Sequence, residues 1–205
     1  MGPWIKLASH PGAFVGQMTD EAIKAVNILY DGVASEMNLK ALDCAVIAGL
    51  MKPQTPDVNM VSAPVMAKER GIQISETVQD KSGVFDSYIK IRIVTEKQER
   101  SVAGTVFSDG KPRFIQIKGI NLDADTAPYE IYTTNNDVPG MIGVLGSVFG
   151  KAGVNIANFQ LGRDQPGGNA IALLYIDAPV SEDVLNELRS GGLFQQARPL
   201  EFDIS

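Results

Sequence analysis

The pattern of apolar and polar positions is clearest from residue 128 to the end of the chain. Short apolar runs bounded by Gly, Pro, Asn and Asp indicate strands, and two longer segments have helical spacing. The expected elements are a strand at 128–134, a helix at 139–153, strands at 154–161 and 169–177, a helix from 181 to about 189 and a strand at 194–204. This order predicts a split βαβ, or ferredoxin-like, arrangement with an antiparallel sheet and both helices on one face.

The pattern before residue 128 is less regular. Helices are expected at 4–18, where Pro11-Gly12 should break or kink the helix, at 39–51 and at 62–70. Strands are expected at 21–30, 72–78, 88–95, 100–108 and 113–117, the third and fourth of them as a hairpin, with a linker at 122–127. The sequence therefore predicts an α+β protein, with a mixed α/β domain at 1–124 followed by a ferredoxin-like βαββαβ domain at 125–205.

Composition narrows the classes of function. The 205-residue chain is 44% hydrophobic, and its net charge of −6 argues against nucleic acid, while the absence of a basic run argues against an anionic membrane surface. Its apolar runs, such as 170–176, are shorter than the ~20 residues that span a bilayer. Cys44 is the only cysteine, which excludes an internal disulfide, and no leader pattern is present, so a reduced, cytoplasmic setting is expected. With His10 as the only histidine, neither a metal site nor a catalytic triad is predicted.

The segment 135–140 is the strongest candidate site, because a strand there passes into a helix. Pro139 suits the first helical position, and Asp137 would cap the helix or present a carboxylate at its start. The free N–H groups of a helix N-terminus favour an anion such as a carboxylate. A carboxylate beside a carboxylate-binding helix end suits a zwitterion, so a free amino acid is the first ligand to consider.

Asn155 and the glycines of the predicted helix at 139–153 each allow two interpretations. Asn155 either bonds its own turn or faces Asn135 and Asp137, across a small pocket or across a subunit boundary. The helical glycines either let the helix pack closely on its sheet or let a ligand or second subunit approach; they are Gly140, Gly143, Gly146 and Gly150. They form no nucleotide-binding signature. The basic residues of the first domain are a solvated face or a small anion site, in which Arg113, after Pro112, would present its planar fork.

Taken together, these segments resemble a known pair of domains. Residues 135–140, the glycine-containing helix and the segment GVNI (153–156) resemble the ACT domain, the small-molecule regulatory module of amino-acid metabolism. The segments VNMVSAP (58–64), AKERGI (67–72) and VAGTV (102–106) resemble the allosteric-substrate-binding domain of long-form D-3-phosphoglycerate dehydrogenase. Arg113, IKG (117–119) and DVPG (137–140) continue that resemblance, which covers essentially the whole chain in the family's order.

The resemblance implies a regulatory role. The family enzyme oxidises 3-phosphoglycerate with NAD in the first committed step of L-serine synthesis, and L-serine inhibits it by binding at paired ACT domains. Its catalytic and nucleotide domains precede the two regulatory domains, and this sequence carries no Rossmann fingerprint. The chain is thus expected to hold no catalytic residue and no cofactor of its own, and to self-associate as a dimer or tetramer.

The resemblance also implies the effector site. The family's effector positions fall on Asn135, Asp137 and Asn155. We expect the serine ammonium to meet Asn135 and Asp137, and Asn155 to come from a partner subunit. The serine carboxylate is expected to meet the backbone around Val138, Pro139 and Gly140. In the upstream domain, the family's anion-binding role falls on Arg113 and Lys118.

Two alternatives remain open from the sequence. The upstream fold also occurs with an ACT domain in iron–sulfur L-serine dehydratase. A cluster needs several cysteine ligands, so this chain would be a non-catalytic partner subunit of such an enzyme. The second alternative is an oligomerisation module that binds no ligand.

Overall fold

The computed structural model describes residues 2–80 and 84–203, and the chain divides into two units, Met1–Gly119 and Ile120–Ser205. Each unit has its own sheet and its own helices, which confirms the predicted α+β class. The division lies a few residues before the predicted boundary after residue 124.

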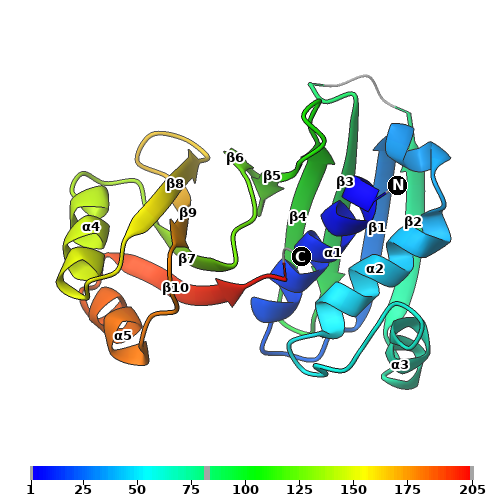
Figure 1. The fold of residues 1–205 in the computed structure, drawn as a ribbon, viewed down its shortest axis with the longest axis horizontal. Helices are drawn as coiled ribbons and strands as arrows, with labels where there is room; N and C mark the ends of the chain where they lie inside the picture. Colours follow the sequence, from blue (N-terminus) through cyan, green and yellow to red (C-terminus); the bar gives the residue numbers. More distant parts are fainter. Residues whose placement is uncertain (1, 81–83, 204–205) are drawn as a thin grey trace. The chain divides into compact units, whose positions relative to one another are not determined.

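The first unit is a mixed sheet with helices on one face (Figure 1). Its strands run in the order β2-β1-β3-β4-β5; β1 and β2 are parallel, and the pairs from β1 to β5 are antiparallel. The predicted hairpin is β3 and β4. The elements of this unit are α1 (Gly2–Gln17), β1 (Ala25–Gly32), the 3-10 helix η1 (Val33–Glu36), α2 (Leu39–Met51), α3 (Ala63–Glu69), β2 (Gln73–Gln79), β3 (Ser87–Val94), β4 (Glu99–Val106) and β5 (Pro112–Ile117).

Helix α1 continues through Pro11, where the sequence predicted a break or kink. The reason is close packing against α2. A Cβ atom on Gly12 would lie 2.3 Å from the Val46 carbonyl oxygen, and one on Gly16 would lie 2.3 Å from that of Leu50. Glycine at these positions lets the two helix backbones touch, and the contact keeps α1 together although Pro11 donates no hydrogen bond.

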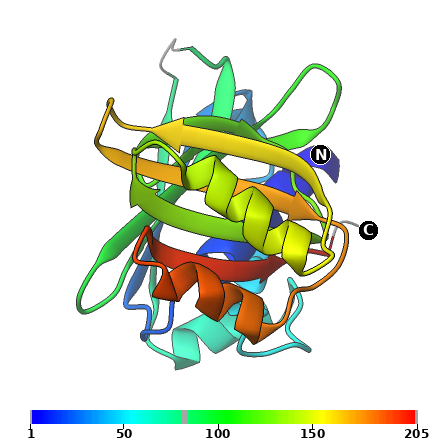
Figure 2. The same ribbon diagram turned by 90° about the vertical axis from the view of Figure 1, so that its left-hand side faces the viewer.

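The second unit has the predicted ferredoxin-like topology. Its sheet order is β10-β7-β9-β8, with every neighbouring pair antiparallel. Helices α4 and α5 lie next to each other on one face (Figure 2), over a core that includes Ile131, Leu145, Phe149 and Leu174. The elements are β6 (Ile120–Ala124), β7 (Tyr129–Asn136), α4 (Met141–Lys151), β8 (Ile156–Arg163), β9 (Asn169–Ile176), α5 (Glu182–Ser190) and β10 (Phe194–Glu201).

Two predicted boundaries differ from the structure. The predicted linker at 122–127 begins inside strand β6, which approaches β8 so closely that a Cβ on Gly162 would lie 2.6 Å from the Asn121 carbonyl oxygen. The last strand ends at Glu201, and Ile204, the predicted end, lies outside the described residues.

The described residues, 2–80 and 84–203, were also searched for two further features. None of their helices has the length and apolar character needed to span a membrane. Nor do these residues bring three His, Cys, Asp or Glu side chains together in a cluster that would hold a metal ion.

Candidate effector site in the second unit

The segment from Asn135 to Gly140 leaves the end of β7 and enters α4 by a tight turn. Gly140 has φ of +94°, in the left-handed region, and its carbonyl oxygen accepts the first helical bond, from Val144 N at 3.0 Å. The helix therefore begins at Met141, and Pro139 belongs to the preceding turn, not to the first helical position as predicted. A left-handed glycine between Pro139 and the helix delays the start, because no helical residue adopts that φ.

Asp137 does not cap the helix; it joins two loops. Its Oδ2 accepts from Arg163 Nη1 at 2.6 Å and from Gly167 N at 3.2 Å, and its own N–H donates to the Gly168 carbonyl oxygen at 2.8 Å. The bond from Arg163, reinforced by that from Gly167, holds the pKa of Asp137 below its usual value. At neutral pH an ionised carboxylate thus lies at this end of the sheet, held between the β7–α4 loop and the β8–β9 loop.

Asn135 lies two residues before Asp137 and is buried, with 1% of its surface exposed. By strand alternation it shares the helix-covered face of β7 with Ile131, a member of the core. Its Nδ2 donates to the Asn136 carbonyl oxygen at 2.7 Å, and its buried Oδ1 has no partner among the described residues. An unpaired buried acceptor is costly, so this oxygen is suited to a donor that arrives with a ligand.

Asn155 lies at the opposite end of the sheet from Asp137. It directly precedes β8, and its Nδ2 donates to Asp177 Oδ2 at 2.8 Å. Strand β8 then runs to Arg163, the partner of Asp137, so the two candidate residues are separated by about 24 Å of strand. In Figure 2 the β7–α4 and β8–β9 loops share one end of the sheet, and the α4–β8 loop lies at the other. The predicted pocket between Asn155 and Asp137 within one chain is therefore wrong, since antiparallel β8 carries them apart.

The glycines of α4 face open space. A Cβ atom on Gly143, Gly146 or Gly150 would meet nothing within 4 Å. The interpretation that they let α4 pack closely on its own sheet is therefore wrong for these three positions. The same helix exposes two apolar side chains, Ile142 (58%) and Val144 (39%), which lie about 200° apart around the helix axis and therefore flank its buried stripe on opposite sides.

Strand β8, next to α4 in the fold, is the edge of the sheet. An edge strand presents unpaired backbone N–H and C=O groups, and proteins often protect such strands; β8 has one such feature, a bulge or irregularity between Ile156 and Asn158. Here Leu161 is partly exposed on the side of the sheet that carries Phe159 and the helices. We call the exposed residues of α4 and of this edge strand that can lie on one side the α4–β8 face; it is defined by Ile142, Gly146 and Leu161.

The predicted anion-binding residues of the first unit do not come together. Arg113 lies at the start of β5, where its Nη2 bonds Asp109 Oδ2 at 2.9 Å and its guanidinium lies 4.4 Å from the centre of the Phe107 ring. Lys118 follows the other end of β5, about 17 Å along the strand, with a positive φ of +52°. Burial of its amine and the charge of Arg100 lower the pKa of Lys118. The two predicted residues therefore belong to opposite ends of β5, and their joint role in an anion site stays a prediction.

Comparison with known proteins identifies the family of this chain. Residues 1–118 match the family described as the D-3-phosphoglycerate dehydrogenase intervening domain. The chain belongs to this family. It is 30% identical over 187 residues to D-3-phosphoglycerate dehydrogenase of Bacillus subtilis (strain 168), in a match that covers 91% of this chain and 36% of that protein. Matches of similar extent link it to proteins of the same name from Synechocystis sp. (32% identical) and Archaeoglobus fulgidus (31% identical).

This chain is much shorter than the relatives that it matches. The chain spans about a third of the length of these D-3-phosphoglycerate dehydrogenases, because the matches cover 34% to 36% of them. The matches are longer than the intervening domain, so they continue into the second unit. The predicted resemblance to this family is thereby confirmed.

Sequence reasoning missed Arg163 as part of the candidate site. The residue is the last of β8 and approaches Asp137 only because the β8–β9 turn folds back beside the β7–α4 loop. A basic residue before a turn rich in Gly and Pro is a weak signal in sequence alone, and only the sheet register places it there.

Proposed function

We propose that this chain is the regulatory part of a D-3-phosphoglycerate dehydrogenase and binds L-serine between the second units of two copies. Membership of the intervening-domain family supports the first half of this proposal. The observation that carries the second half is the placement of Asp137 and Asn155 at the two ends of one exposed edge strand.

A two-fold axis explains that placement. If β8 of one copy pairs antiparallel with β8 of another, the start of each strand meets the end of the other. Asn155 of one copy then lies beside Arg163 and Asp137 of its partner, and two equivalent sites form. The same pairing satisfies the edge strand and brings the α4–β8 faces of the two copies together, where Gly146 offers room for close approach.

The groups at each such site suit a small zwitterion. The ionised carboxylate of Asp137, with its Oδ1 remaining, meets the ammonium. The backbone N–H groups of Val138 and Gly140 and the Arg163 guanidinium meet the carboxylate. Pro139 shapes the turn and donates nothing. Asn155 from the partner supplies an amide that both donates and accepts, which suits a hydroxyl group and distinguishes serine from alanine.

Regulation follows by linkage. A ligand held by residues of two copies binds the paired arrangement better than the separate one, and it shifts the equilibrium by the ratio of those affinities. The dehydrogenase reaction itself, its 3-phosphoglycerate substrate and its NAD belong in this proposal to the part of the relatives that lies outside this chain.

The two alternatives have less support. The reported relatives are named D-3-phosphoglycerate dehydrogenase, not dehydratase. A module without a ligand does not account for the polar groups that a β8–β8 pair would bring together, Asp137 and Arg163 of one copy and Asn155 of the other.

Titration calorimetry of the chain with L-serine, glycine and 3-phosphoglycerate tests the proposal. We expect a saturable heat with L-serine, a weaker one with glycine and none from 3-phosphoglycerate at this site. Asp137→Asn and Asn155→Ala should each abolish the serine heat, whereas Asn186→Ala, an exposed amide on α5, should keep it. Serine binding that survives in both site variants would overturn the proposal, and so would the absence of serine binding by the unaltered chain.

A further inference from the structure

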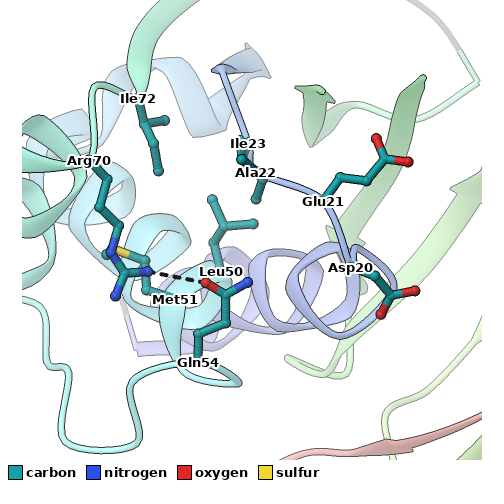
Figure 3. A pocket seen from close by; sticks show the side chains of 9 residues that line it. All are labelled: Asp20, Glu21, Ala22, Ile23, Leu50, Met51, Gln54, Arg70 and Ile72. Atoms are coloured by element: carbon teal, nitrogen blue, oxygen red, sulfur yellow. Dashed lines mark hydrogen bonds between the residues drawn. The ribbon is translucent and has the colours of Figure 1, made fainter. Parts of the chain in front are cut away.

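A cavity of about 460 Å³ opens in the first unit, and none of its lining residues belongs to the candidate sites described above (Figure 3). Three segments form it: the α1–β1 loop, the last turn of α2 and the α3–β2 connection. Strands β1 and β2 start side by side, with Gln73 N donating to the Lys24 carbonyl oxygen at 2.9 Å, so the residues just before them, Ile23 and Ile72, meet at the same place.

The floor of the cavity is apolar. Leu50 and Met51, each 3% exposed, come from the end of α2, and Ile23 and Ile72 are half-buried. Figure 3 shows Ile72 and Leu50 pointing toward each other across the space, with Ala22 and Ile23 beside them. The volume is within the range of small-molecule sites, and an apolar floor of this kind favours an aliphatic body.

Arg70 lies at the rim with its guanidinium held in place by neutral groups. Its Nη1 donates to Gln54 Oε1 at 3.2 Å and its Nη2 donates to Thr55 Oγ1 at 2.8 Å. Within the part of the chain that the structure describes, no carboxylate forms an ion pair with Arg70. A guanidinium has five N–H donors in a fixed fork, so donors remain for a carboxylate. Gln54, whose Oε1 is used by Arg70, has its amide NH₂ left as a second donor at this rim.

The opposite rim carries negative charge. Asp20 and Glu21 line that side and turn away from Arg70 (Figure 3), and Glu21 Oε2 accepts from Thr95 Oγ1 at 2.7 Å. A second anionic group on the ligand would be repelled there, and the two acids do not turn inward to receive an ammonium. The ligand that fits has one negative end and an uncharged apolar end.

We propose that this cavity binds a small aliphatic monocarboxylate, with its carboxylate on Arg70 and Gln54 and its hydrocarbon chain on Leu50, Ile23 and Ile72. The site is separate from the proposed serine site in chemistry and in the residues that form it. Failure of the serine test would therefore not contradict this proposal, and failure of the test below would not contradict the proposed serine site.

Methyl NMR of the full 205-residue chain provides the test, with 4-methylpentanoate as the probe. We expect saturable shifts of the Ile23 and Ile72 methyl signals. The neutral amide of the same acid, and a dicarboxylate of equal length, should bind roughly tenfold or more weakly, since each loses the charged contact or gains repulsion. Leucine should also bind more weakly than 4-methylpentanoate.

Three variants separate this site from general charge attraction. Arg70→Gln should abolish the shifts, and Ile72→Phe should block them by filling the space while leaving Arg70 in place. Lys52→Gln removes the same charge from an exposed residue next to Met51, and binding should persist. The proposal is overturned if no saturable shift occurs, if Arg70→Gln binds as the unaltered chain does, or if Lys52→Gln loses as much affinity as Arg70→Gln.

Discussion

Asp137 and Asn155 lie at opposite ends of strand β8, one tied to its last residue through Arg163 and the other immediately before its first. Within one chain they cannot share a ligand the size of an amino acid. Between two copies related by an antiparallel β8 pair they meet twice. The proposed serine site therefore needs residues from two copies of the chain, and mixing two variant chains can test this.

Mixing two inactive variants should restore part of the binding. In an equal mixture of Asp137→Asn and Asn155→Ala chains, each mixed pair has one site with both residues intact and one site with neither. If pairs form at random, about a quarter of the original sites return. Calorimetry of the mixture with L-serine measures this fraction, and each variant alone serves as the control. If the mixture gives no more heat of L-serine binding than either variant alone, the site is not shared between copies.

Gly146→Ala should stabilise the single chain and weaken its pairing. The added methyl group meets nothing within the chain, and alanine favours a helix over glycine by about 1 kcal/mol. The same methyl group would intrude where a second copy approaches. Urea unfolding of dilute protein measures the first effect, and sedimentation at rising concentration measures the second. Ser147→Ala is the control, because it adds no bulk to the helix. If Gly146→Ala and the unaltered protein pair equally well, α4 is not part of the interface.

Gly140→Ala should destabilise the second unit by about 1 kcal/mol, because alanine resists the positive φ of this residue. A Cβ there meets no atom within 4 Å, so the effect is conformational and not steric. Serine affinity should fall as well, since the N–H groups of the turn lose their orientation. Unfolding and calorimetry on the same sample measure both effects. Gly143→Ala, in the regular helix two residues beyond Met141, should have the opposite effect on stability, and a similar loss in both variants would contradict the account.

Asp43 should make the first unit less stable as the pH rises. Burial raises the pKa of Asp43 to about 7, and the hydrogen bond and charge of Glu76 act in the same direction, while the bond from Tyr30 hydroxyl at 2.6 Å opposes them. A raised pKa stabilises the folded state fully below the unfolded value, near 4, and this contribution is lost as the pH passes through about 7.

Asp43→Asn keeps an acceptor for Tyr30 and removes the titration. We expect the urea midpoint of the unaltered chain to fall between pH 5 and pH 8 more than that of this variant. Asp57→Asn, an exposed acid in the same unit, controls for the loss of one charge. Parallel pH curves for Asp43→Asn and the unaltered chain would show that Asp43 does not titrate in this range.

Glu130 should act in the same direction in the second unit. It is fully buried, and burial raises its pKa to about 8, although the bond from Ala127 N to its Oε1 at 2.7 Å partly opposes the shift. The stability it contributes below its unfolded pKa is lost as the pH rises through about 8, a change of a few kcal/mol. Glu130→Gln retains an acceptor for Ala127 and should abolish that part of the pH dependence in urea unfolding. Glu201→Gln, on an exposed residue of the same unit, is the control; a decline that persists in Glu130→Gln would contradict the assignment.

Much of the fold follows from local patterns in the chain. The continuous apolar run of β9, the strand-forming residues of β7 and the helical spacing of α4 predict a sheet with helices packed against it. The same patterns locate Asp137 and Asn155 at element ends. They do not reveal that Pro11 remains inside α1, because that depends on how closely Gly12 and Gly16 let α2 approach.

Local patterns along the chain account for the two α+β units, the βαββαβ order and the resemblance to the family. The pairing of polar residues comes from tertiary contacts: Arg163 with Asp137, Asn155 with Asp177, and Arg70 with Gln54 at the mouth of an apolar cavity. Secondary structure is set by neighbours along the chain, whereas these contacts depend on strand register and on how distant segments come together. A pattern read along one chain carries little of that information.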